Sequence, residues 1–179
     1  MPMVPFYTKF PDIAAPETRT AQLSGDTEIP DGEYGFLELY CNEAGCDCRR
    51  VFIQVISPGA NNEAPLATIN FGWESEAFYR DWVHASEDDD IVAVMEGSSL
   101  ALAEQSELAP HFLELFESMT EDPAYVNRLR QHYELFRHAV EKGYGDGNRN
   151  ILASRTTQRR VETSVGPNKP CPCGSGLEA

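Results

Sequence analysis

The chain has 179 residues, 41% of them hydrophobic, which is enough for one domain with a buried core. Its 14 Lys and Arg residues against 29 Asp and Glu residues give a formal net charge of −15, which repels phosphate backbones, so we expect no nucleic-acid partner. No apolar run is long enough to cross a bilayer, and the first ten residues lack the basic start and apolar stretch of a secretion signal. We therefore expect a cytoplasmic protein without a membrane span.

The N-terminal third predicts a loop followed by a β-meander. Residues 1–31 are rich in Pro, Thr and acidic residues without a sustained period, which predicts loop that packs through three aromatic side chains: Phe6, Tyr7 and Phe10. Segments rich in β-branched and aromatic residues then predict three antiparallel strands: 34–41, 49–56 and 67–71. In the second strand the period of two puts three residues on one face: Val51, Ile53 and Val55.

From residue 76 onward the apolar residues recur with the spacing of a helix. A short amphipathic helix is expected at 76–84, a second helix begins near Ser106 as its N-cap, and a third begins at Asp122 and ends at Gly143. Apolar residues recur at steps of three and four in the last two helices: Leu108, Phe112, Leu115, Phe116, Met119, and Val126, Leu129, Tyr133, Phe136, Val140. A meander followed by helices predicts an α+β fold.

Composition divides the chain into a single α+β domain at 1–148, a linker at 149–169 and a short tail at 170–179. Residues 151–179 hold four basic and two acidic residues, a net charge of +2, which leaves 10 basic and 27 acidic residues, a net charge of −17, in the rest. We interpret this segment as solvated, with a contact to an anionic surface as the alternative.

All five cysteines fall in two clusters, Cys41, Cys46 and Cys48 at the predicted hairpin tip and Cys171 and Cys173 near the C-terminus. Thiolates at such short spacings, in turns rich in Gly and Pro, can converge on one tetrahedral cation. An odd number of cysteines and a reducing cytoplasm both disfavour disulfides, so we interpret both clusters as zinc ligands. In the competing interpretation the hairpin cysteines are small core residues that bind nothing.

A structural zinc takes four ligands, so the hairpin cluster is one ligand short. Asp47, a histidine or a tail cysteine folded back onto the hairpin would complete one shared site. Alternatively, the hairpin holds its own metal, and the tail pair stays flexible or binds zinc jointly with a partner or a second copy of the chain. We favour a hairpin site that does not depend on the tail.

The tail residues Val165 to Gly176, Val-Gly-Pro-Asn-Lys-Pro-Cys-Pro-Cys-Gly-Ser-Gly, resemble the SEC-C motif, the small zinc-binding element at the C-terminus of the preprotein translocase ATPase. In that family Cys-x-Cys and a later Cys-Cys or Cys-His pair hold the metal. The sequence stops at Ala179 without the second pair. The resemblance therefore implies ligand roles for Cys171 and Cys173 in a C-terminally truncated motif.

The body resembles uncharacterised bacterial proteins that carry the SEC-C motif. This resemblance rests on the Tyr-Cys-x4-Cys-Asp-Cys-Arg-Arg-Val pattern at 40–51 and on Gln-Ser-Glu-Leu-Ala-Pro at 105–110. It implies metal binding and does not indicate any catalysed reaction.

Other polar motifs predict no site. His132 and His138 lie six residues apart on a predicted helix and cannot share a face, so surface or cap positions are expected for all four histidines: His84, His111, His132 and His138. The acidic run at 87–90 lacks the spaced ligands of a calcium loop, and 143–147 lacks the Lys and Ser/Thr of a phosphate-binding loop. These two segments are interpreted as a solvated turn and a linker.

The sequence supports three functional hypotheses. The first is a non-enzymatic zinc-binding module for protein interaction, because a site closed by thiolates leaves no open position for a substrate. The second is a redox-responsive zinc switch, in which Arg49 and Arg50 favour the thiolate of Cys48, and oxidation of Cys46 and Cys48 releases the metal. The third and least supported is a zinc hydrolase with water as fourth ligand, for which no general base stands near the cluster.

Overall fold

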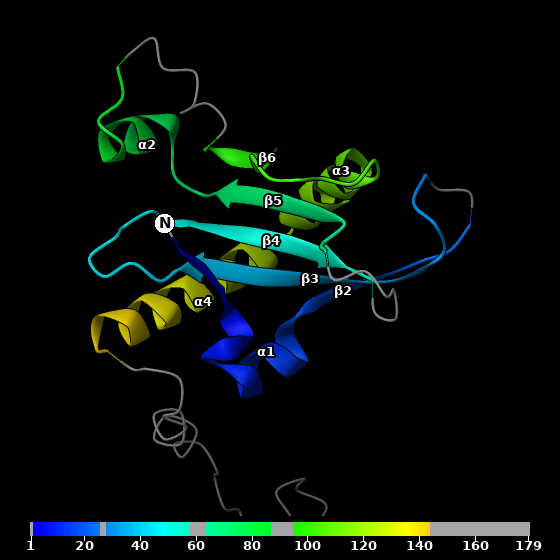
Figure 1. Ribbon diagram of the computed structural model, residues 1–179, viewed down its shortest axis with the longest axis horizontal. Coiled ribbons are helices and arrows are strands. Elements are labelled where there is room, and N and C mark those ends of the chain that lie inside the picture. The colour runs from blue at the N-terminus through cyan, green and yellow to red at the C-terminus, as the bar shows by residue number, and fades with distance from the viewer. Residues whose placement is uncertain (1, 26–27, 58–63, 87–94, 144–179) are drawn as a thin grey trace, which may run out of the picture. The chain divides into compact units, whose positions relative to one another are not determined.

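The computed structural model describes residues 2–25, 28–57, 64–86 and 95–143, and within these ranges it has the predicted α+β fold (Figure 1). The strands are β1 (Met3–Pro5), β2 (Arg19–Leu23), β3 (Gly32–Cys41), β4 (Arg50–Ile56), β5 (Ala67–Gly72) and β6 (Gly97–Leu100). The helices are a 3-10 turn (Phe6–Thr8), α1 (Pro11–Glu17), α2 (Glu76–Trp82), α3 (Ala109–Thr120) and α4 (Pro123–Glu141). The expected linker at 149–169 and the tail at 170–179 lie outside the described residues.

All strands join one antiparallel sheet in the order β1-β3-β4-β5-β6. The predicted meander is its centre, with Phe36 opposite Val55 and Ile53 opposite Ile69. Strand β2 pairs with the first half of β3, and β1 pairs with its last three residues, so both lie along the same edge of β3.

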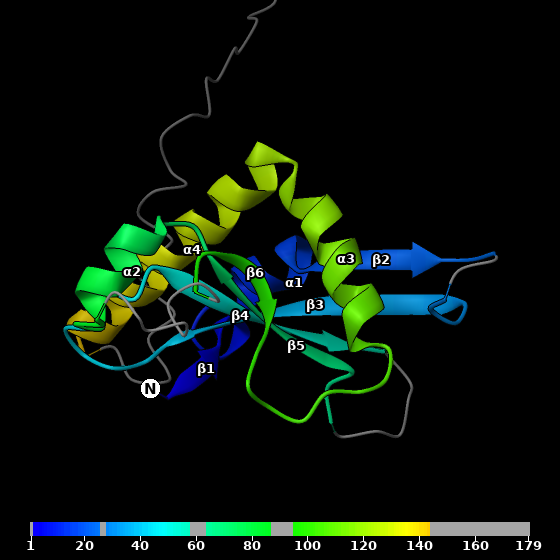
Figure 2. The ribbon, with the colours of Figure 1, turned by 90° about the horizontal axis from the view of Figure 1, so that it is seen from above.

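Helices α3 and α4 cover one face of this sheet, as Figure 2 shows. The predicted face of β4 is buried: Val51, Ile53 and Val55. Phe116 of α3 packs between rings of two strands, with ring centroids 6.5 Å from Phe36 and 5.6 Å from Phe71. The stripes predicted on α3 and α4 all contribute to this core, fully or partly buried.

The N-terminal residues depart from the predicted loop. They form β1, α1 and β2, because their partner is β3, a contact between distant segments that leaves no local period. Phe6 is buried and Phe10 packs against the core as expected, but Tyr7 is 48% exposed. Strand β6 was also not predicted, since its four residues contain two serines and one glycine.

The predicted N-cap residue is correct for α4 and wrong for α3. Asp122 caps α4 as expected, accepting a bond from the N–H of Ala124, and Gly143 follows the helix with φ of +65°. Ser106 was expected to cap α3, but the helix begins at Ala109. The Ser106 hydroxyl instead accepts the N–H of Leu108 and closes the turn that leads into the helix.

Candidate metal centre

The three hairpin cysteines converge at the β3–β4 connection. Cys41 is the last residue of β3, Cys46 lies in the loop, and Cys48 stands two residues before β4. Their sulfur atoms all lie within 4.8 Å of one another. Cys41 and Cys48 are fully buried and Cys46 is half-buried, so the open side of the cluster is at Cys46. The expected cluster at a hairpin tip is therefore confirmed.

The spacing of the sulfurs fits a tetrahedral soft cation. With a zinc–sulfur distance of about 2.3 Å, two sulfurs at the tetrahedral angle lie about 3.8 Å apart. No two of the sulfurs here lie more than 4.8 Å apart, which exceeds this distance by at most about 1 Å, a difference that rotation about the side-chain bonds can close. Thiolates select zinc, cuprous ion or iron–sulfur clusters over hard cations such as magnesium.

Hydrogen bonds fix the backbone of the β3–β4 loop at Arg49, which has an uncommon backbone conformation. Arg49 has φ of +42°, in the left-handed region that non-glycine residues rarely adopt. Its N–H donates to the Tyr133 hydroxyl of α4 at 3.2 Å, and its carbonyl accepts from the Tyr79 hydroxyl of α2 at 2.8 Å. Two tyrosines from separate helices thus stabilise the turn that aims Cys48 at the cluster.

Helix α4 also binds the other end of the loop. Nη1 of Arg137 donates to the carbonyl oxygens of Cys41, at 3.2 Å, and Glu43, at 2.8 Å. In Figure 1 the cyan loop and the yellow C-terminal end of α4 lie at the same end of the sheet. The loop is therefore fixed by tertiary contacts before any metal binds.

Burial favours the protonated form of the Cys46 and Cys48 thiols when no metal is bound. It raises the pKa of Cys48 to about 12, with Cys46 and Cys41 adding to the effect. Burial also raises the pKa of Cys46, and hydrogen bonding with Cys41 adds to it. A bound cation would have to displace these protons, so metal affinity should rise with pH.

Of the two arginines expected to promote the Cys48 thiolate, Arg50 does so, although its effect is smaller than that of burial. The Arg49 guanidinium bonds to Asp47 at 3.0 Å and to Glu74 at 3.4 Å, so its charge is already paired. Arg50 does lower the pKa of Cys48, but burial is the larger effect and the net shift is upward.

No fourth ligand from the described part of the chain joins the three sulfurs. Asp47 was one candidate, but its carboxylate is held by Arg49 and accepts a bond from the Tyr133 hydroxyl at 3.3 Å. The hydrogen bond from Arg49 lowers the pKa of Asp47, and its side chain is 57% exposed. The other candidates in the tail, Cys171 and Cys173, lie outside the described residues.

A buried polar network at His132 contradicts the expected surface position of this histidine. Its Nδ1 lies 2.6 Å from Oε2 of Glu38, and its Nε2 lies 3.1 Å from Oε2 of Glu17 at the end of α1. The Tyr40 hydroxyl donates to the same Glu38 oxygen at 2.9 Å, and the Phe6 ring stacks on the imidazole at 4.3 Å. The network joins α4, β3 and the N-terminal segment.

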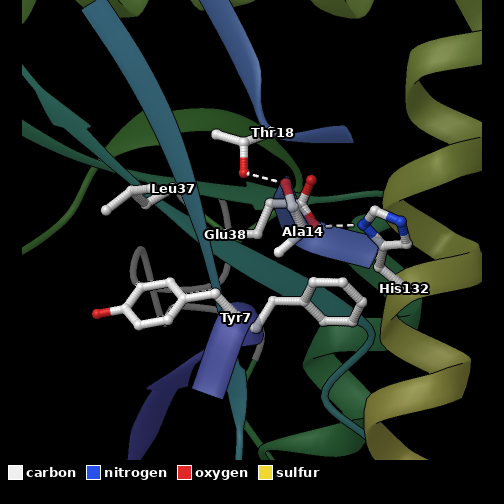
Figure 3. A pocket seen from close by; sticks show the side chains of 7 residues that line it. Tyr7, Ala14, Thr18, Leu37, Glu38 and His132 are labelled. Atoms are coloured by element: carbon white, nitrogen blue, oxygen red, sulfur yellow. Dashed lines mark hydrogen bonds and ion pairs between the residues drawn. The ribbon is translucent and has the colours of Figure 1, made fainter. Parts of the chain in front are cut away.

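The helical spacing of the apolar residues around His132 already indicates that this side chain is buried. His132 follows Leu129 by three residues and precedes Phe136 by four, which places it on the core-facing stripe. A small pocket lies beside it, as Figure 3 shows, lined by Phe6, Tyr7, Ala14, Thr18, Leu37, Glu38 and His132.

The remaining histidines join no group of metal-ligating side chains among the described residues. His84 and His138 are exposed, as expected, and His111 is half-buried on α3. The acidic run at 87–90 and most of the glycine-rich segment at 143–147 lie outside the described residues. In the part of the chain that the structure describes, no helix is both long and apolar enough to traverse a bilayer.

Comparisons with known proteins add no relative: no protein-family model, no curated protein and no solved structure matches the chain.

Proposed function

We propose that this protein binds one zinc ion through Cys41, Cys46 and Cys48 and acts as a non-enzymatic module for protein interaction. The observation that carries the proposal is the convergence of three sulfurs within 4.8 Å on a loop that two helices hold in place. Such a centre would stabilise the hairpin tip and the helices bonded to it, because a bound metal contributes its binding energy to folding.

The proposal also covers the compartment, the C-terminal segment and the class of partner. A soluble protein in the reducing cytoplasm would keep its thiols available for metal. The C-terminal segment, with its resemblance to the SEC-C motif, would supply the contact with a protein partner. Nucleic acid is an unfavourable partner for a body of net charge −17, obtained from 10 basic and 27 acidic residues.

Metal analysis of the purified full chain tests the proposal. We expect one zinc per chain in the wild type and a large loss of zinc in a Cys46→Ser variant, because the half-buried Cys46 offers one of the three sulfurs. A matched Ser118→Ala variant, with the change on the exposed side of α3, should keep its zinc. Full zinc occupancy in the Cys46→Ser variant would contradict the assignment.

The redox-responsive switch remains the second candidate, because Cys46 is half-buried and its sulfur lies within reach of Cys48. The raised pKa values of both thiols disfavour oxidation in the metal-free chain, since the thiolate is the reactive form. Peroxide-triggered zinc release with formation of one disulfide would favour this function. A zinc hydrolase has the least support, because the nearby carboxylate of Asp47 is engaged by Arg49.

A further inference from the structure

Helix α2 packs on the residue that follows Cys48 in the hairpin loop. The Arg49 guanidinium stands over the ring of Phe78, 4.7 Å from its centroid, and its Nη1 lies 3.4 Å from Oε1 of Glu74, just before α2. The buried Tyr79 donates from its hydroxyl to the Arg49 carbonyl at 2.8 Å. Both the side chain and the backbone of Arg49 are therefore bound by α2 and the residues that lead into it.

Arg50 contacts the end of the same helix. Its guanidinium lies 5.5 Å from the centroid of the Trp82 ring, and the attraction of a cation to the face of an aromatic ring stabilises this contact. Trp82 follows Phe78 by four residues, so both rings lie on one face of α2, the face turned toward the loop. In Figures 1 and 2, α2 and the cyan loop lie at the same end of the sheet.

A smaller set of contacts holds α2 elsewhere. The helix has seven residues, and an isolated helix shorter than about 12 residues is marginal in water, so α2 depends on its packing. Away from the loop, Tyr79 packs with Met95 in a small cluster apart from the main core, and Glu96 accepts the N–H of Glu76 at 2.9 Å. The contacts with the hairpin loop are therefore a large part of what keeps α2 in place.

A metal bound by the three hairpin cysteines would hold this loop closed. Cys48 is joined directly to Arg49, so the loop cannot leave α2 by a large movement while Cys48 stays bound to an ion shared with Cys41 and Cys46. A ligand that binds only the closed form of a locally opening segment suppresses the opening by mass action.

We propose that α2 and the hairpin loop open as one unit and that zinc holds both closed. Loss of the metal then frees the aromatic side chains of Phe78 and Trp82, which makes α2 a metal-controlled contact surface of the module. The coupling is reciprocal, so contacts that fix α2 on the loop also raise the affinity for zinc. This inference rests on the zinc site proposed above.

Hydrogen exchange followed by mass spectrometry, on the full chain with and without zinc, tests the coupling. Helix α1 is the matched control, because it also has seven residues and its Glu17 bonds to His132 instead of to the hairpin loop. With free zinc at 100 times its dissociation constant, full coupling slows exchange by up to about 100-fold. We expect at least about tenfold slowing in α2 and less than about twofold in α1.

Metal analysis of the same samples separates the two possible failures. One zinc per chain, with exchange slowed equally in α2 and α1 or in neither helix, would overturn the coupling alone. Absence of bound zinc would overturn the zinc site itself.

The reciprocal effect is tested by Tyr79→Phe, which keeps the ring and removes the bond to Arg49. Competition with a chromophoric chelator should show zinc affinity reduced about three- to tenfold, the range expected for one hydrogen bond. Tyr125→Phe is the matched control and should keep the wild-type affinity, because Tyr125 is also buried and its hydroxyl makes no hydrogen bond within the described ranges. Equal zinc affinities for the two variants, both folded by circular dichroism, would contradict the coupling.

Discussion

Replacement of Gly72 by alanine tests how tightly β5 packs beneath α2. Gly72 ends β5 and pairs with Arg50 at the start of β4, next to the hairpin loop that connects β3 and β4. A Cβ atom at this position would lie 1.9 Å from the carbonyl oxygen of Met95 and 2.5 Å from the Tyr79 hydroxyl. Both separations are far below van der Waals contact, so the strand or the opposing segment has to move by about 1 Å or more.

The expected cost has two parts. Overpacking a close contact of this kind destabilises a protein by about 1–3 kcal/mol. Displacement of Tyr79 also breaks its 2.8 Å bond to the Arg49 carbonyl, which adds about 1 kcal/mol. We therefore expect the free energy of unfolding to fall by about 2–4 kcal/mol, or the melting temperature to fall by about 5–15 °C for a chain of this size.

Urea denaturation monitored by circular dichroism measures this change, and Gly35→Ala is its control. A Cβ atom on Gly35, in β3 on the other side of β4, would meet its nearest atom, in Ile56, at 3.4 Å, an ordinary contact. We expect a change within about 1 kcal/mol of zero for this variant. Equal stabilities of the Gly72→Ala and Gly35→Ala proteins would refute the close packing of Tyr79 and Met95 over β5.

Two further predictions concern titratable groups. His132→Leu leaves the Glu38 carboxylate, 5% exposed, without its imidazole partner and should cost about 3–5 kcal/mol in urea denaturation, whereas His138→Leu, exposed on the same helix, should stay within about 0.5 kcal/mol. Similar losses for the two variants would show that the buried pair does not form. In the metal-free protein, Cys48 has a folded pKa raised to about 12, above its unfolded value of about 8.5, so the stability that it contributes is present below pH 8.5 and lost as pH rises toward 12. The free energy of unfolding should fall by up to about 1.4 kcal/mol per pH unit more steeply in the wild type than in Cys48→Ala above pH 9, and parallel pH curves would contradict the buried thiol.

Local sequence patterns determined most of the central elements. Segments rich in β-branched and aromatic residues identified β3, β4 and β5, and the period of two identified the buried face of β4. The steps of three and four identified the core faces of α3 and α4, because these signals depend on neighbouring residues along one element. The spacing of the hairpin cysteines likewise predicted their cluster, since a short loop keeps its residues close in space whatever surrounds it.

Only the tertiary structure decided what these elements contact. Strands β1 and β2 form because β3 offers them an edge, and Glu38 meets His132 across 94 residues of sequence, so neither has a local signature. The same holds for Arg137, which reaches the hairpin loop from the far end of the domain sequence. The spacing of apolar residues along a helix or strand can place a residue on the buried face. The partner that compensates a buried charge comes from another segment, and the two meet only when the chain has folded.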